Sequence, residues 1–528
     1  MPEIPRFPSL KAVLEGLEQA IGPEAVVHSA PYPLIGQANV SEFAPRDTYA
    51  VVRPRSVGDV RSLTTAFHAE ADLPGLHPVS TGRNWGLGSK EPASGPVVRV
   101  ELDGLSSIRR LDVEAGFAVV EPGVTQKALS ERLLGTDRML NVTASSGHTS
   151  VLGNTVDRGV GLRRQRTEDL LGLEVVLPDG AVVHVGWWPD SGKGAAFNRY
   201  GLGPSLLHLF TQSGYGIVTA AVVRLLPRPE QQVTVRAGFR RAVLPRVVDA
   251  LRRWKANGLI AGVIKVYDTA STATYGGGDI DGGYVAHLCV EGTRRSVAAL
   301  RAVLEGELAD SGLFTAVAFG DEEPPAAEDV VGAVVQAAYH GSVAHNEQML
   351  ASATGAQAPR VDTEGGGWLF FLPLLPFDGA SVTRALAVLD RIHEATGIRP
   401  GSTVNALDAD VIDLVVSFPF VRDREATAAH RALDLAHAWF GEAGFHPYRL
   451  DADHAGWGLD PASPEVRARS RHGRAGRGPV PGDPHPRAAG HGEGRRSRLS
   501  EPGRRPGPEV PLAHLLTRSA RSVPPTSV

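Results

Sequence analysis

The sequence predicts an α+β protein with two folding units and a tail that lacks a packed core. Residues 46–228 contain short apolar strands between glycine-rich turns, whereas residues 229–445 contain longer helices with a 3.6-residue apolar period. A chain of 528 residues also exceeds the size that a single hydrophobic core usually reaches, which supports a division into units.

Local signals define the elements of the first unit. Ser56 precedes apolar positions at helical spacing and therefore predicts a helix start. Asp179-Gly180 lies between two apolar runs and predicts a β-hairpin, because both residues tolerate a positive φ. Strands are predicted over residues 49–53, 97–102, 117–120, 173–177, 181–185 and 217–226.

The second unit is predicted to alternate strands with amphipathic helices. Apolar periodicity predicts helices over residues 244–254, 382–392 and 424–440, and Gly397 provides a C-terminal stop for the second of them. Strands are predicted over residues 284–290, 368–372 and 412–418. This unit should therefore have a core of its own.

Bulk composition excludes several classes of protein. The formal charge of -4 gives no field that would recruit nucleic acid or an anionic membrane. The one cysteine, Cys289, permits neither an internal disulfide nor a cysteine-based metal cluster. No apolar run has the length of a signal-peptide core or a membrane span, so we expect a cytoplasmic protein.

Three glycine-rich loops carry the strongest functional signal. Residues 80–89 (STGRNWGLGS) can turn sharply and aim successive backbone N–H groups at one point, as a pyrophosphate site requires, although an ordinary tight loop is the alternative. No long helical pattern follows, so this loop is not a Rossmann fingerprint. Residues 147–161 and 214–219 are two further loops of this kind, which makes coincidence a poor explanation.

Together with residues 51–60 and 120–125, these loops resemble the flavin domain of the FAD-linked oxidoreductases typified by p-cresol methylhydroxylase and vanillyl-alcohol oxidase. The resemblance implies a two-part FAD-binding domain at residues 1–228, with a core at 46–228, a substrate-cap domain at 229–445, and a return to the FAD domain at 446–466. It also implies that FAD is held by Ser80, Thr81, Gly82, Arg83, Asn84, Gly86, Pro122, Gly123, Gly147, Ser150, Gly153, Asn154, Asp157, Gly216, Ile217 and Val218.

The resemblance also suggests catalytic residues. Tyr448 and Arg449 match a pair that binds the substrate phenolate in the phenol-oxidising members, although a Tyr-Arg dipeptide can equally mark a strand edge. His148 lies in a cofactor loop and is either an acid-base group or an ordinary loop histidine. Two departures weaken para-alkylphenol oxidation in particular. Leu87 stands where a second phenolate-binding tyrosine is expected, and Ser145 and Ser146 replace an acidic residue.

Flavin attachment and metal binding are judged from the side chains available. Arg83 and the segment 411–416 occupy the two family positions for a flavin link, and neither offers a linking nucleophile, so the FAD is predicted to be non-covalent. No metal site is expected, because His472, His485 and His491 lack ligand spacing.

These inferences predict an FAD-dependent oxidase acting on a phenol, hydroquinone or related aromatic secondary metabolite, with dioxygen as electron acceptor. A drug-resistance role, in which a reduced quinone antibiotic such as mitomycin is reoxidised, fits the same chemistry. The alternatives are a flavin-bearing protein that sequesters a drug without turnover and an NAD(P)H-dependent flavin reductase. The expected partners are a small aromatic substrate and dioxygen, without nucleic acid or membrane, and a homodimer is one option for the assembly.

The C-terminal segment departs from the rest of the chain. Residues 467–528 are rich in Arg, Gly and Pro, contain no Lys, and show no apolar period, so we expect them to be disordered. The family resemblance also stops near residue 467. A frameshift that replaced the native C-terminus is one hypothesis, and a genuine basic tail that binds an acidic partner is the other.

Overall fold

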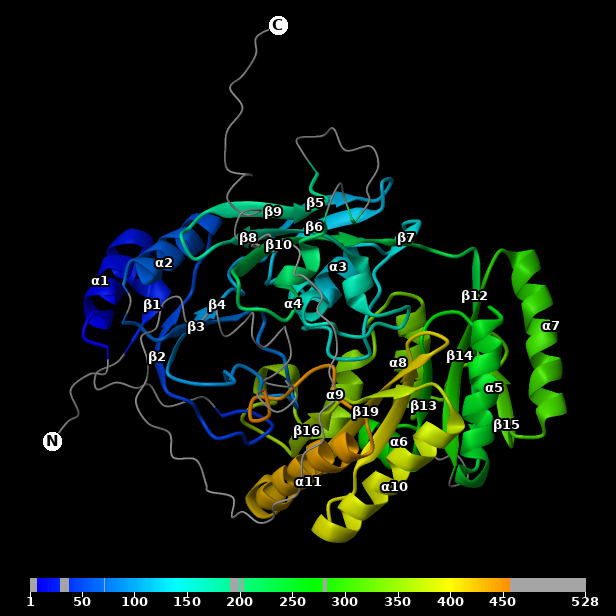
Figure 1. The fold of residues 1–528 in the computed structure, drawn as a ribbon. Helices are drawn as coiled ribbons and strands as arrows, with labels where there is room; N and C mark the ends of the chain where they lie inside the picture. The colour runs from blue at the N-terminus through cyan, green and yellow to red at the C-terminus, as the bar shows by residue number, and fades with distance from the viewer. Residues whose placement is uncertain are drawn as a thin grey trace, which may run out of the picture. The chain divides into compact units, whose positions relative to one another are not determined.

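Three main sheets, formed by successive parts of the chain, make up the fold in the computed structural model (Figure 1). The structure describes residues 7–28, 38–70, 72–189, 199–200, 204–278 and 283–455. The predicted tail at 467–528 and the frameshift hypothesis lie outside these residues, as does the end of the return segment after residue 455. No helix within the described ranges is long and apolar enough to cross a membrane.

The first sheet has four strands and is covered by α1 (Leu10–Ile21) and α2 (Val57–Ala69), whose apolar side chains share its core. Its order is β1 (Val26–Val27), β2 (Thr48–Val52), β4 (Val97–Glu101) and β3 (Gly75–Val79), with β2 and β3 both parallel to β4. The predicted helix start is confirmed, because Ser56 Oγ accepts a hydrogen bond from Asp59 N at 3.1 Å.

The second sheet is antiparallel and has five strands. Its order is β5 (Ile108–Asp112), β6 (Phe117–Val120), β10 (Ile217–Arg224), β8 (Leu170–Val176) and β9 (Val182–Gly186). The predicted hairpin joins β8 to β9, but only Gly180 has a positive φ, of 82°. Asp179 stabilises the turn differently, because its Oδ1 accepts a hydrogen bond from Ala181 N at 2.9 Å.

Short elements lie between or directly after the strands of these two sheets. They are α3 (Gln126–Arg132), α4 (Val151–Val156) and the two-stranded pair β7 (Arg138–Met139) and β11 (Leu226–Pro227). Of these, α4 is a helical turn inside the predicted loop 147–161. The described 3₁₀ turns are η1 (Pro23–Ala25), η2 (Arg166–Asp169), η3 (Leu207–Phe210), η4 (Arg241–Val243) and η5 (Ala358–Arg360).

The large sheet begins after Pro227. Its order is β15 (Ala316–Phe319), β12 (Gln231–Phe239), β14 (Tyr284–Gly292), β13 (Ile264–Tyr267), β18 (Gly401–Ala406), β19 (Val411–Phe420) and β16 (Gly367–Phe371), with β17 (Leu374–Pro376) also paired to β19. The predicted strands β14, β16 and β19 are confirmed. The sequence analysis missed β12, β13, β15, β17 and β18. Of these, β13, β15 and β17 have only three or four residues, too few to show a distinctive period.

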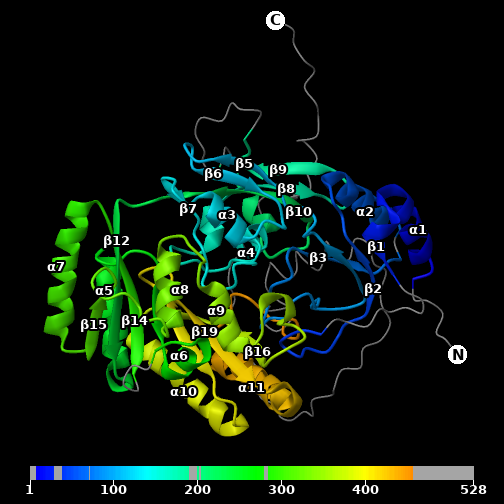
Figure 2. The same ribbon diagram turned by 180° about the vertical axis from the view of Figure 1, so that it is seen from behind.

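Side chains alternate between the two faces of this sheet. One face packs against α5 (Leu244–Ala256), α7 (Arg294–Ser311), α10 (Gly379–Thr396) and α11 (Arg422–Glu442). The other carries α6 (Thr269–Tyr275), α8 (Val330–Tyr339) and α9 (Asn346–Thr354), and its core continues into the second sheet. Figures 1 and 2 show α8 and α9 on the side of the large sheet that faces α3 and α4.

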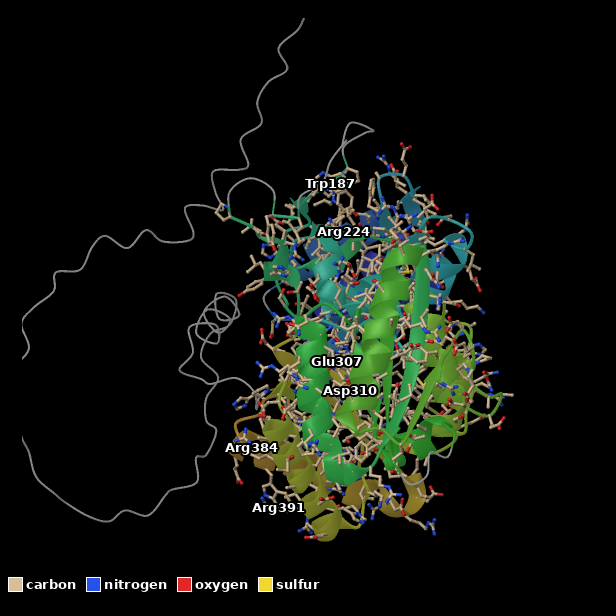
Figure 3. The ribbon with its side chains drawn as sticks, turned by 90° about the vertical axis from the view of Figure 1, so that its right-hand side faces the viewer. Trp187, Arg224, Glu307, Asp310, Arg384 and Arg391 are labelled. Carbon is tan, nitrogen blue, oxygen red and sulfur yellow. The ribbon has the colours of Figure 1, made fainter. Side chains whose placement is uncertain are left out.

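The segment that follows α11 packs against α10 and α11. Arg384 and Arg391 of α10 are labelled in Figure 3. Arg384 stacks over the ring of Phe445 at 5.0 Å, and Arg391 stacks over the ring of Trp439 of α11 at 4.3 Å. Asp451 accepts hydrogen bonds from His437 of α11 at 2.9 Å and from His454 at 2.8 Å. The contacts of Phe445, Asp451 and His454 hold residues 445–454 against α10 and α11.

Candidate functional site

One cavity, of about 560 Å³, lies where the predicted cofactor loops meet the large sheet. Twelve of the sixteen predicted cofactor residues line it, and they are Ser80, Thr81, Gly82, Arg83, Asn84, Pro122, Ser150, Gly153, Asn154, Asp157, Gly216 and Val218. Gly86, Gly123, Gly147 and Ile217 are adjacent in sequence but do not line it. Tyr448 and Arg449 also line the cavity, whereas His148 does not.

The loop 80–89 starts at the carboxyl end of β3, and glycine is required at its turns. Gly82 has a φ of 67° and Gly86 a φ of 82°, a region that other residues enter only with strain. Phe370 N of β16 donates a hydrogen bond to Gly86 O at 2.9 Å, and a Cβ at Gly86 would lie 2.3 Å from the Phe370 ring. The loop is therefore held tightly against the large sheet.

Ser150 joins three of the predicted loops. Its Oγ accepts a hydrogen bond from Gly153 N at 2.9 Å, and donates to Pro122 O at 2.6 Å. Its backbone N donates to Thr81 Oγ1 at 3.2 Å. The loops 80–89 and 147–161 and the segment 120–125, which are distant in sequence, thus converge on one wall of the cavity.

Tyr448 and Arg449 connect this wall to the large sheet. The guanidinium of Arg449 donates to Asn84 Oδ1 at 2.7 Å and is ion-paired with Asp157. Gln212 Nε2 donates to Tyr448 O at 3.0 Å, which fixes the backbone of the pair. Burial raises the pKa of Tyr448 well above its usual value, so its hydroxyl is neutral and donates to Asp413 Oδ2 at 3.4 Å.

A polar rung, Lys265, Asn405 and Asp413, crosses the opposite wall. These residues occupy paired positions on β13, β18 and β19, so their side chains share one face of the sheet. Lys265 Nζ donates to Asn405 Oδ1 at 2.6 Å, and Asn405 Nδ2 donates to Asp413 Oδ2 at 3.2 Å. Lys265 is only 8% exposed and Asp413 only 1%.

Burial moves the pKa values of both charged groups of the polar rung toward neutrality. It lowers the pKa of the Lys265 ammonium to about 8 and raises that of the Asp413 carboxyl to about 6. Strongly perturbed groups in a cavity are typical of functional sites. The sequence analysis missed the polar rung, although a charged residue in the apolar run 411–416 was a usable signal.

Aromatic and apolar side chains form the remaining walls. The rings of Trp368 and Phe370 lie 4.5 Å apart, and that of Tyr275 lies 6.0 Å from Trp368. Leu87 lines the cavity at the position where a tyrosine was expected, and Ser145 and Ser146 line it where an acid was expected. The cavity therefore suits a flat aromatic molecule, with its polar groups at Tyr448, Arg449 and the polar rung.

Comparison with known proteins characterises part of the first unit. Residues 48–186 match the model of a family described as FAD binding domain. The chain contains an FAD-binding domain. The prediction of FAD as the cofactor is thereby confirmed.

Two sequence relatives support the predicted family resemblance. The chain is 36% identical over 216 residues to a 1'-carboxy-chondrochloren decarboxylase of Chondromyces crocatus, which covers 40% of each chain. It is 34% identical over 198 residues to the flavoprotein subunit of a hydroxylating 4-cresol dehydrogenase of Pseudomonas putida, which covers 36% of this chain and 38% of that one. The alignments thus span less than half of these relatives.

Solved structures extend the similarity to the whole fold. The structure of p-cresol methylhydroxylase with bound substrate matches with a TM-score of 0.77 at 22% identity, over 88% of this chain and 94% of that one. A 4-ethylphenol oxidase from Gulosibacter chungangensis matches with the same TM-score at 21% identity, again over 88% and 94%. The predicted fold class, a p-cresol methylhydroxylase type α+β fold, is confirmed.

Proposed function

We propose that this protein is an FAD-dependent oxidoreductase that oxidises a small phenolic, hydroquinone or related aromatic metabolite. The main support is the single cavity that joins the loops of the FAD-binding domain to an aromatic chamber with polar groups at its ends. FAD, when bound, supplies the acceptor for a hydride or for two electrons and a proton. The 4-cresol dehydrogenase and 4-ethylphenol oxidase relatives add support for an aromatic substrate.

The residues around the cavity suggest how the two ligands are held. We assign the FAD to the wall formed by residues 80–89 and 147–161, where glycines allow the backbone to come close to a pyrophosphate. Tyr448 and Arg449 are then placed to bind the oxygen of a phenol, since a buried hydroxyl and a guanidinium both favour an anionic oxygen. Apolar walls exclude water from the same chamber.

Several finer assignments belong to the same proposal. We infer that dioxygen reoxidises the FAD, although one relative is named as a dehydrogenase. The Chondromyces relative, named as a decarboxylase of a carboxy-chondrochloren, favours a secondary metabolite as substrate, and reoxidation of a reduced quinone drug such as mitomycin fits this class. A cytoplasmic location and a homodimer remain predictions.

Anaerobic spectroscopy of the purified yellow protein tests the function. We expect p-cresol, hydroquinone or a related phenol to bleach the flavin absorbance, and air to restore it. A phenol that binds without bleaching would favour a sequestering protein, and bleaching by NADPH alone would favour a flavin reductase. Bleaching that only an artificial acceptor reverses would retain the oxidoreductase but replace the oxidase with a dehydrogenase.

A further inference from the structure

Asp413 has an open hydrogen-bonding position inside the cavity. Its Oδ2 accepts hydrogen bonds from Asn405 and Tyr448, but its Oδ1 is buried and has no hydrogen-bond partner among the described residues. An unpartnered buried carboxylate oxygen is costly, because it has lost its water without replacement. A group that arrives with a substrate is the natural donor, since Asp413 lines the cavity.

Lys265 also has hydrogen-bonding capacity that its described partners do not fill. An ammonium has three N–H donors, and Lys265 has one hydrogen-bond partner within the described part of the chain, the neutral Asn405 side chain. It has no ion pair there, yet it is almost fully buried. Its positive charge acts on Asp413 across Asn405 and opposes the effect of burial on the Asp413 pKa. A purely structural lysine would normally pair directly with a carboxylate.

We propose that Asp413 is the catalytic base that takes the hydroxyl proton of the substrate, and that Lys265, through Asn405, is a positioning residue that keeps Asp413 ionised. This assignment rests on the proposed function and deepens it.

The reaction balances with FAD as the electron acceptor. The substrate C–H bond breaks, and its electron pair leaves with the hydrogen as a hydride to FAD. The substrate O–H bond breaks heterolytically, and its electron pair remains on the substrate to form the new π bond to oxygen. The released proton forms an O–H bond with Asp413 Oδ1, so a neutral acid replaces a carboxylate in the cavity and the product is oxidised by two electrons.

The charges around Asp413 suit a base near neutral pH. The groups that face it are Lys265 and Asn405 from the neighbouring strands, and Tyr448 and Arg449 from the segment after α11. Burial raises the pKa of Asp413 to about 6, which leaves it ionised at pH 7 but more basic than an exposed aspartate. Loss of the Lys265 charge should raise this pKa further.

The number of protons released when a phenol binds distinguishes a catalytic base at Asp413 from a structural residue. This measurement does not require the enzyme to turn over. We would bind 4-nitrophenol to the FAD-loaded protein near pH 7 in weak buffer. The nitrophenolate band reports ionisation of the bound probe, and an indicator dye reports protons released to solvent. In the wild type the band should form without proton release, because Asp413 keeps the proton. In Asp413→Asn, each newly ionised probe should release about one proton.

Equal proton release in the two proteins would overturn the assignment. If no phenol or hydroquinone bleached the flavin, the proposed function itself would be rejected, whereas equal proton release in a protein that phenols do bleach would overturn only this assignment, so the two failures are distinguishable. In support, anaerobic flavin reduction by a phenol that bleaches the wild type should be slowed on the order of 100-fold in Asp413→Asn.

Lys265→Met provides a second test that does not depend on the Asp413 variant. The wild-type rate of flavin reduction should fall as the pH drops through about 6, and in Lys265→Met this acid limb should move to higher pH. Lys255→Met is the matched control, because Lys255 is a partly buried lysine that donates to Gly262 O outside the cavity. An acid limb that stays in place in Lys265→Met would overturn the positioning role.

Discussion

A single methyl group at Gly153 tests the geometry of the proposed FAD site. Gly153 lies in α4, and a Cβ there would sit 2.3 Å from Ser80 Oγ and 3.1 Å from Ser80 Cβ. Ordinary contacts between such atoms are about 3.5 Å, so in Gly153→Ala the Ser80 hydroxyl must move by roughly 1 Å. Ser80 opens the loop 80–89, and the displacement should therefore spread into the cofactor wall.

Two opposed effects set the size of the change in stability and FAD affinity in Gly153→Ala. Overpacking of this kind costs about 1–3 kcal/mol, whereas alanine in a helix is favoured over glycine by about 1 kcal/mol. Without FAD the loop 80–89 can relax, so the free energy of unfolding should change little. With FAD the loop must return to its place, and FAD affinity should fall by roughly 5- to 150-fold.

Titration of the apoprotein with FAD, followed by flavin fluorescence, measures this change. Gly306→Ala in α7 is the matched control, because a Cβ at Gly306 meets no atom within 4 Å. It should leave FAD affinity unchanged and raise the free energy of unfolding by up to about 1 kcal/mol. Wild-type FAD affinity in Gly153→Ala would show that the contact between Ser80 and α4 does not shape the cofactor site.

Three further predictions concern the flavin, the substrate and stability. Acid precipitation should release the FAD, because Arg83 and residues 411–416 offer no linking nucleophile; colour retained in the pellet would contradict this. Tyr448→Phe and Arg449→Ala should each slow flavin reduction by roughly two to three decades with little loss of bound FAD, and unchanged kinetics would leave the pair a structural role. Burial alone would raise the pKa of Asp451, but hydrogen bonds from His437 and His454 lower it below its usual range. The stabilisation is therefore present above about pH 4 and lost as the pH falls further, so urea unfolding of Asp451→Asn should show a deficit of about 2–4 kcal/mol at pH 7 that shrinks at pH 3.

Local sequence determined the cofactor loops and many of the elements. The positive φ values at Gly82 and Gly86 are properties of single positions, so a glycine pattern can reveal them before any fold is known. The same holds for the helix start at Ser56 and the helix end at Gly397, where a cap depends on a few adjacent residues. The family resemblance that these loops carry then implied FAD.

Tertiary structure alone decided which polar side chains of the large sheet line the cavity. Lys265, Asn405 and Asp413 are separated by up to 148 positions in the chain, and only the register of β13, β18 and β19 places them in one rung. Two of these three strands were not predicted, because β13 has only four residues and β18 (GSTVNA) contains few apolar residues. Sequence could therefore indicate the cofactor, whose predicted loops are local, but not the polar rung, because strand pairing depends on contacts between distant parts of the chain.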